Sequence, residues 1–211
     1  MPVKVVLRTS KSHSPFRDIL NRLITCPIGE SLILCSGYIW EPDADSSTYK
    51  ILDDGLLETI KKGCASGVTV TVAGKFSEEV WKEHYRNFVF RLRDAGVRVQ
   101  AFVAPKKNWH AKIAIRLKGK VPIAALVGSS NLTGPAYRLN SCHWNFESDV
   151  LIWPNNPELN TYFRSSLSNQ NRVGNLDLIL DPEVQQLSEQ EQLDNLLSDI
   201  ESGNLTQLDS E

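Results

Sequence analysis

Apolar positions along the chain fall into short blocks that follow two different spacings. Continuous or every-second apolar residues predict strands at residues 3–9, 31–40, 68–72, 97–103, 110–117, 121–128, 147–153 and 175–180. Apolar residues three and four positions apart predict helices at residues 15–26, 48–62, 77–96 and 156–168. Strands that alternate with helices predict an α/β layered fold, in which a mixed central sheet is flanked by helices on both faces.

Polar and helix-breaking residues mark the ends of two predicted helices. Ser14 and Pro15 are the residue types preferred at the N-cap and the first position of a helix, and Pro27 ends that helix. Near the C-terminus, Ser188 and Glu191 form a capping-box pattern ahead of an amphipathic stretch. We therefore expect a further short helix close to the end of the chain.

Charge divides the chain into a basic part and an acidic part. The net charge of −2 combines +8 over residues 1–120 with −10 over residues 121–211, and residues 98–120 hold seven basic residues and no acid. Residues 181–211 hold nine acidic residues and no basic one. Such asymmetry favours an anionic ligand on one side of the molecule. We expect one catalytic domain at residues 1–180 and an acidic tail at residues 181–211, which forms a short helix and then a disordered end.

The sequence favours a cytoplasmic protein without a membrane span. No apolar run approaches the roughly 18 residues that a membrane helix needs, and the N-terminus lacks the apolar segment and cleavage site of a signal peptide. The four cysteines, Cys26, Cys35, Cys64 and Cys142, form neither a Cys-x-x-Cys pair nor a zinc-binding spacing. We interpret them as buried thiols in a reducing compartment.

The residues best suited to chemistry begin at the strand predicted for residues 110–117. Side chains two positions apart on a strand point to the same side, so His110, Lys112 and Arg116 are expected to share one face. An imidazole can act as a nucleophile or a proton carrier near neutral pH, and an ammonium can hold a phosphoryl oxygen. Trp109 is expected either to pack beside this site or to stack on a base.

A second group of polar residues follows the strand predicted for residues 121–128. Gly128 allows close approach of the backbone to a ligand, and Ser129 and Ser130 offer hydroxyl donors. Asn131 adds an uncharged amide that can bind an oxyanion at any pH. If the two strands pair, this loop lies beside Lys112, within reach of one shared phosphate.

His-x-Lys, a strand and then Gly-Ser-x-Asn resemble the signature of the phospholipase D superfamily. The resemblance covers residues 1–165 as an architecture and is specific over residues 109–150. The fuller family pattern also places an Asp beyond the Lys, and residues 113–117 hold none. Several single-motif nucleases of the superfamily also lack that Asp, so its absence favours a nuclease over a lipase.

The resemblance implies a role for each residue of the motif. It implies a phospholipase D-like layered fold and catalytic roles for His110, Lys112 and Asn131. Family members also carry a Glu that bonds the far nitrogen of the histidine, and Glu147 stands at a comparable distance; Asp149, on the same strand face, is the competing candidate. Substrate contacts are expected from Ser129, Ser130, Arg116 and Trp109.

The family mechanism needs two histidines on opposite sides of the phosphorus, and this chain has one His-x-Lys. A second copy must supply the other, so we expect a two-fold homodimer with a shared active site. One His110 would form a phosphohistidine, and the other would protonate the leaving oxygen. No acidic cluster suited to Mg²⁺ accompanies the motif, so we expect no metal and no other cofactor.

A nuclease is the leading interpretation, because a basic run suits a polyanionic backbone. The alternatives are a phospholipid or small-phosphodiester hydrolase, and a non-catalytic or partner-dependent subunit. The acidic tail could dock on a partner such as a motor ATPase in a bacterial restriction or anti-phage defence assembly. It could also lie across its own basic site as an autoinhibitor, or be a disordered solubilising tail.

Overall fold

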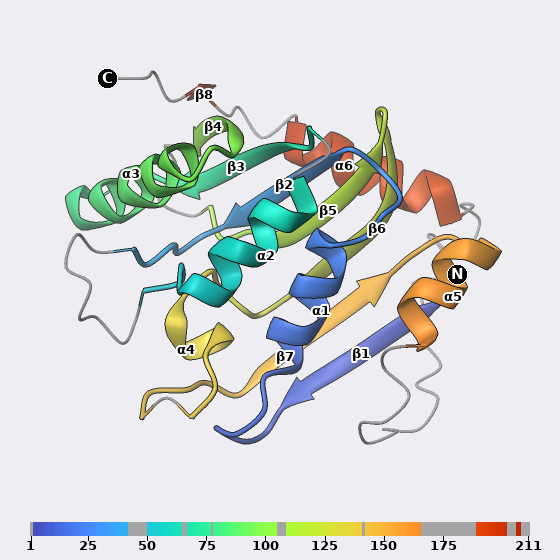
Figure 1. The fold of residues 1–211 in the computed structure, drawn as a ribbon, viewed down its shortest axis with the longest axis horizontal. Helices are drawn as coiled ribbons and strands as arrows, with labels where there is room; N and C mark the ends of the chain where they lie inside the picture. Colours follow the sequence, from blue (N-terminus) through green and yellow to red (C-terminus); the bar gives the residue numbers. More distant parts are fainter. Residues whose placement is uncertain are drawn as a thin grey trace.

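A computed structural model of the chain describes residues 2–41, 50–64, 67–76, 78–104, 109–140, 142–165, 189–201 and 206–207. In this part of the chain, eight strands form one mixed sheet in the order β1-β7-β6-β5-β2-β3-β4-β8 (Figure 1). The strands β2, β3 and β4 are parallel, and the other neighbours are antiparallel. The strands are β1 (Val3–Arg8), β2 (Ser31–Ser36), β3 (Thr69–Lys75), β4 (Arg98–Ala104), β5 (Lys112–Lys118), β6 (Val121–Gly128), β7 (Glu147–Ile152) and β8 (Thr206–Gln207).

Helices cover both faces of this sheet, which confirms the predicted fold class (Figure 1). The larger apolar cluster joins one sheet face to the first five helices, and a second cluster joins the other face to the last helix. The helices are α1 (Pro15–Ile24), α2 (Asp54–Cys64), α3 (Glu79–Asp94), α4 (Gly134–Tyr137), α5 (Pro157–Ser165) and α6 (Glu189–Glu201).

Helix α1 forms for the reasons that its sequence suggests. The Ser14 side chain accepts a hydrogen bond from the backbone N–H of Arg17, and Pro15 occupies the first turn. The apolar stripe that includes Ile19 and Leu23 is buried against the sheet. Burying these side chains stabilises the helix by far more than its intrinsic propensity does.

Two predicted elements differ from the observed ones. The strand predicted for residues 31–40 ends at Ser36, because the chain bends at Gly37 and Ile39 then forms an isolated parallel bridge with Leu132. The helix predicted from residue 48 begins at Asp54. Residues 51 and 52 are buried outside the helix, and the Asp53 carboxylate accepts from the Leu56 N–H as a cap.

Other elements and the cysteines differ from the sequence predictions or cannot be compared with them. Helix α4 and strand β8 were not predicted from the sequence. The strand expected at residues 175–180 and the Ser188 of the capping box lie outside the described residues. Cys26 and Cys35 are buried free thiols as expected, but Cys64 is only partly buried and Cys142 is exposed, since it follows α4 in a surface loop.

Helix α6 belongs to the acidic segment and lies against the sheet. Leu193 and Leu197 are buried in the second apolar cluster, and Gln190 donates to the carbonyl of Pro122 at 3.3 Å. Asp194, by contrast, is exposed. The division into a domain and a tail stays a prediction, but the helix in this segment covers the sheet face that the other helices leave open. None of the described helices combines the length and the apolar character needed to cross a bilayer.

Candidate active site

The candidate catalytic residues gather at one edge of the sheet, where the ends of strands from both directions meet. The carboxyl ends of β2, β3 and β6 lie at the same edge as the amino ends of β5 and β7 because of the strand directions. Ser36 is the register partner of Lys112, and Gly128 is that of Asp149. The antiparallel pairing of β5 with β6 therefore brings the two parts of the motif together, as the sequence predicted.

His110 lies in the segment just before β5, not on the strand itself. The strand begins at Lys112, and the residue between them is held by the hydrogen bond from the Gly37 N–H to the Ala111 carbonyl at 2.7 Å. A Cβ atom on Gly37 would lie 3.1 Å from both Cα and Cδ2 of His110. Glycine at this position lets the backbone of residue 37 pass directly beside the imidazole.

The imidazole of His110 is exposed and contacts two side chains. The Lys112 ammonium lies 2.8 Å from Nδ1, and the Tyr38 ring meets the imidazole edge to face at 5.3 Å between ring centres. An ammonium has only donors, so Nδ1 accepts and the neutral ring carries its proton on Nε2. Attack through Nε2 requires the opposite tautomer, with the proton on Nδ1 and an acceptor beside it.

The surroundings of His110 favour its neutral form. Desolvation lowers the pKa of His110, and the positive charges of Lys112 and Lys75 lower it further. Lys75, at the end of β3, is largely buried and pairs with Glu78 at 3.2 Å. The ring is therefore unprotonated, and available as a nucleophile, to a lower pH than a free histidine would be.

Asn131 is held by the segment that follows β2, whose Tyr38 ring also contacts His110. Its side-chain oxygen accepts from the backbone N–H of Tyr38 at 3.2 Å, and the N–H of the next residue, Leu132, donates to the Ser36 hydroxyl at 3.0 Å. Because Oδ1 is engaged, the amide NH₂ is the part of Asn131 that is left to donate. The side chain is thus oriented to offer donors to an oxyanion.

Glu147 lies at the same edge but contacts other partners. It is buried, and it accepts hydrogen bonds from the Ser129 hydroxyl and, at 3.1 Å, from the Asn145 amide. Desolvation lowers the pKa of Lys112, and the negative charge of Glu147 opposes only part of that shift. Within the described part of the chain, no hydrogen bond joins Glu147 to His110, so one protomer does not make the expected orienting contact.

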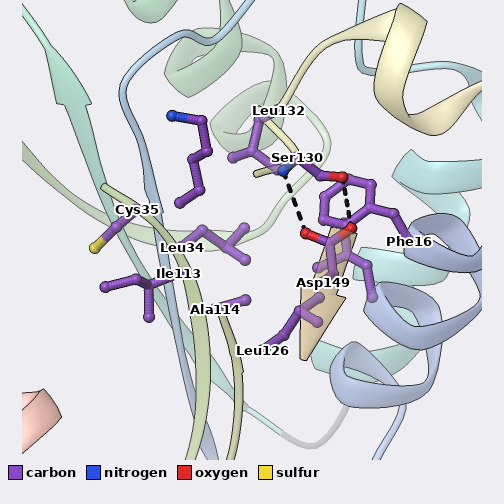
Figure 2. A pocket seen from close by; sticks show the side chains of 11 residues that line it. Phe16, Leu34, Cys35, Ile113, Ala114, Leu126, Ser130, Leu132 and Asp149 are labelled. Atoms are coloured by element: carbon purple, nitrogen blue, oxygen red, sulfur yellow. Dashed lines mark hydrogen bonds between the residues drawn. The ribbon is translucent and has the colours of Figure 1, made fainter. Parts of the chain in front are cut away.

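Asp149, the competitor of Glu147, holds the loop instead of facing the histidine. It accepts from the backbone N–H of Ser130 at 3.2 Å and from the hydroxyl of Ser130 at 2.6 Å (Figure 2). Burial raises the pKa of Asp149 to about 6, although the two bonds from Ser130 oppose the shift. The side chain of Ser130 is buried and engaged in this contact, and its role as a substrate-binding residue stays a prediction.

A small cavity lies beneath this loop, beside Asp149 (Figure 2). Its volume is about 10 Å³, which is room for one water molecule at most. A phosphate group does not fit in a space of this size. The lining includes Phe16, Leu34, Lys112, Ala114, Leu126, Ser130 and Asp149.

The structure places two further residues that were assigned to substrate binding, Arg116 and Trp109, in contact with other parts of the fold. Arg116 is buried, and its guanidinium donates to the carbonyls of Cys26, Ile28 and Gly29 at 2.9, 3.3 and 2.8 Å. It therefore fixes the connection between α1 and β2. Trp109 is partly buried and packs against the apolar cluster that contains α6, on the opposite side of the sheet from α1. The structure agrees with packing for Trp109, and its contact with substrate stays a prediction.

Three residues near His110 were not predicted from the sequence. Gly37, Tyr38 and Lys75 all contact or act on the imidazole, and they come from the segment after β2 and the end of β3, far from the motif in the chain. The sequence does contain one usable signal. A glycine followed by two aromatic residues at positions 38 and 40 interrupts an otherwise aliphatic strand. Ser129, the remaining assigned residue, is exposed and donates to Glu147.

Comparisons with known proteins find one matching family model and several similar solved structures. A family model described as "Cardiolipin synthase, PLD-like domain" matches residues 41–170. The chain is similar to Nuc from Salmonella typhimurium, a phospholipase D family member, at 19% identity and a TM-score of 0.45, with 78% of this chain and 90% of that one covered. It is also similar to NucT from Helicobacter pylori, at 18% identity and a TM-score of 0.43, with 77% and 95% covered.

A polyphosphate kinase from Porphyromonas gingivalis is similar at 16% identity and a TM-score of 0.47, with 82% of this chain and 27% of that one covered. No curated protein sequence matches the chain. The family model spans more than half of the chain and includes the whole His-x-Lys and Gly-Ser-x-Asn region. On this match, the protein belongs to the phospholipase D superfamily.

Proposed function

We propose that the protein is a metal-independent phosphodiesterase that cleaves nucleic acid through a phosphohistidine at His110, in an active site shared by two copies of the chain. One observation carries the proposal. An exposed imidazole, a lysine ammonium and an oriented asparagine amide converge at one sheet edge, and desolvation together with the neighbouring positive charges lowers the pKa of the imidazole. This set can attack phosphorus and hold the oxygens that gain charge.

The reaction would proceed in two displacements. In the first, Nε2 of His110 bonds to phosphorus, the bond from phosphorus to the leaving oxygen breaks, and the imidazole of the second protomer gives that oxygen a proton. In the second, the same imidazole takes a proton from water, whose oxygen attacks phosphorus and releases His110. Lys112 and Asn131 of both protomers would hold the non-bridging oxygens throughout.

The contacts within one protomer support the need for a second one. Lys112 occupies Nδ1 of His110 and imposes the wrong tautomer for attack, while Glu147 makes its hydrogen bonds elsewhere. A phosphate would draw Lys112 toward its oxygens and leave Nδ1 to another partner. In a two-fold dimer, the carboxylate that orients each imidazole would then come from the opposite protomer.

Nucleic acid is the substrate class that the charges favour. His110 and Lys112 lie within the basic stretch of residues 98–120, and backbone phosphates dominate the affinity of proteins for nucleic acid. Membership in a restriction or anti-phage assembly, with an ATPase partner, remains a prediction from the sequence. Helix α6 uses its apolar side on its own sheet, so such a partner would meet its acidic outer side.

The test is incubation of the purified protein with single-stranded and duplex DNA and RNA in EDTA. We expect cleavage by the wild type and none by His110→Ala, while His13→Ala, which alters a histidine paired with Asp18, stays active. Alkaline quenching during turnover should trap an acid-labile phosphoryl adduct on His110. A requirement for Mg²⁺, or cleavage by His110→Ala, would contradict the proposal.

Mixing the two proteins tests the shared site. If each site needs both histidines, an equal mixture of wild type and His110→Ala after subunit exchange should retain about a quarter of the activity of the same total amount of wild type, because only one dimer in four then carries two intact chains. Independent sites would retain about half. Light scattering on the same samples should show dimers, and a monomeric active enzyme would overturn the shared-site part of the proposal.

A further inference from the structure

A row of aromatic rings leads away from His110 across the surface. The Tyr38 ring lies 5.3 Å from the imidazole and 4.5 Å from the Trp81 ring, measured between centres. Trp81 lies 5.5 Å from Trp40, which in turn lies 4.3 Å from His84. The rings come from the segment after β2 and the first half of α3, two parts of the chain that the His-x-Lys motif does not include.

These rings are not part of the hydrophobic core. Tyr38, Trp40 and Trp81 belong to neither of the two apolar clusters, and each is partly exposed. Tryptophan and tyrosine rings that retain exposed surface beside a catalytic group are suited to stacking on planar ligands. Packing alone explains why the rings touch one another, but not why the row remains partly open to solvent and begins at the imidazole.

Cations border the row, but acidic partners partly neutralise them. The Lys75 ammonium lies 5.0 Å from the centre of the Tyr38 ring and pairs with Glu78. Lys82, one turn along α3, pairs with Glu79 at 2.9 Å. The local charge is therefore mixed, and its attraction for a phosphate backbone is reduced. Aromatic surface, more than net positive charge, distinguishes this part of the molecule.

We propose that Tyr38 and Trp81 form a stacking site for the nucleobase next to the scissile phosphate, and that the enzyme consequently prefers single-stranded nucleic acid. The inference rests on the proposed nuclease function. In a duplex, neighbouring base pairs cover both faces of each base, so a base must leave the stack before an aromatic side chain can take it. A single strand presents its bases at much lower cost, and stacking accepts any base because each has a π-face.

The experiment compares strands that differ only in their bases. KM for cleavage in EDTA and Kd from fluorescence anisotropy are measured for a single-stranded oligonucleotide, its duplex, and a strand of equal length with abasic sugars around the cleavage site. The proteins are wild type, Trp81→Ala, Trp81→Phe and Phe90→Ala. Phe90 is the matched control, because it is an exposed aromatic residue on the same helix, nine positions from Trp81.

We expect Trp81→Ala to raise KM and Kd for the base-containing single strand by about tenfold or more over wild type, since one stacked base contributes on that scale. The same substitution should leave KM and Kd for the abasic strand nearly unchanged. Trp81→Phe should recover most of the loss, and Phe90→Ala should behave as wild type. Melting temperatures of the variants show whether a loss reflects unfolding. Unfolding would weaken the binding and cleavage of both strands equally.

The outcomes separate this inference from the proposed function. Equal losses for the base-containing and abasic strands, or a wild type that prefers duplex, would overturn the stacking site while cleavage itself still supports the nuclease. If wild type cleaves no strand, the nuclease proposal fails. The Kd values then decide the inference alone: a selective effect of Trp81→Ala on the base-containing strand supports the stacking site, and no selective effect overturns it.

Discussion

The ammonium of Lys112 lies 2.8 Å from Nδ1 of His110, which places the two central residues of the motif in direct contact with each other. Desolvation lowers the pKa of His110 and the charge of Lys112 lowers it further, but the contact occupies the nitrogen that must carry the proton during the proposed attack. It also withholds Lys112 from a phosphate. In the proposed function this is a resting arrangement, which a substrate phosphate would open by drawing the ammonium away.

Replacing Lys75 with Met should raise the pKa of His110. The positive charge of Lys75 is one cause of the lowered pKa of His110, so its removal makes protonation of the ring easier. At low pH, His110 is protonated and cannot attack, so kcat/KM falls. This acid limb of the profile of kcat/KM against pH should then move to higher pH. NMR titration of the His110 ring gives the same quantity in the absence of substrate.

The control for this variant is Lys82→Met, which removes a cation that does not act on His110. Its pH profile should overlay that of the wild type. Since Lys75 also contacts the Tyr38 ring, KM and pH dependence are measured separately. An acid limb that stays in place, or moves to lower pH, in the Lys75 variant would contradict the electrostatic role.

Replacing Gly37 with Ala should damage catalysis more than stability. The new Cβ would lie 3.1 Å from two atoms of His110, so the exposed imidazole has to give way by a few tenths of an ångström. Small displacements of a reacting group are costly to rate, and we expect kcat to fall about tenfold or more. The melting temperature should change little, because His110 is at the surface. Gly55→Ala on α2, where the nearest atom is at 3.4 Å, should affect neither quantity.

The sequence predicted the sheet and the motif well because both depend on local spacing. Alternation along residues 110–117 correctly placed Lys112 and Arg116 on one face of the strand. It could not show that β5 is buried on both faces, between two apolar clusters, so that only its first residue reaches the site. Arg116 lies four residues beyond Lys112 on β5, which is about 13 Å along the strand. At that position its side chain contacts the carbonyls of the α1–β2 connection and not the active-site edge.

The residues that the sequence did not reveal act through space from other strands. Lys75 ends β3, and Tyr38 follows β2, so their nearness to His110 depends on the strand order of the sheet. Strand order is not encoded in any local spacing. Local spacing also could not distinguish Glu147 from Asp149, because alternation places both on one face of β7. Their different hydrogen-bond partners depend on how the loop after β6 folds.

Replacing Asp149 with Asn should flatten the dependence of stability on pH in the acidic range. The folded protein binds a proton at Asp149 with a pKa of about 6, against the ordinary value of 3.8, so the free energy of unfolding falls as the pH rises between these values. The shift corresponds to about 3 kcal/mol. Asn has no proton to lose, and its amide can still bond to Ser130.

Urea unfolding at pH 4, 5, 6 and 7 measures this effect. Relative to the wild type, Asp149→Asn should gain stability steadily from pH 4 to pH 6 and keep the gain at pH 7. Asp94→Asn, at an exposed position on α3, should run parallel to the wild type across the range. Parallel curves for Asp149→Asn would show that the carboxyl is not protonated in the folded protein.

Replacing Arg116 with Met should destabilise the fold without a specific effect on catalysis. The guanidinium donates to three backbone carbonyls in a buried setting, and their loss of partners should cost about 2–4 kcal/mol. Lys118→Met, two residues along at an exposed position, should be neutral. At a temperature where the variant is folded, its KM for nucleic acid should match that of the wild type. A raised KM in a folded Arg116→Met protein would restore the substrate-binding role that the sequence suggested.

Replacing Leu193 with Ala tests what the acidic C-terminal segment does. Its side chain is fully buried between α6 and the sheet, so the truncation should lower the free energy of unfolding by about 2–5 kcal/mol. Ser198→Ala, exposed on the same helix, should change nothing measurable. The helix lies on the sheet face opposite α1, so we expect kcat/KM of the folded variant to be unchanged. An autoinhibitory segment would instead release activity when its anchor is weakened, and a disordered tail would show no loss of stability at all, so calorimetry and cleavage on the same preparation separate the three roles.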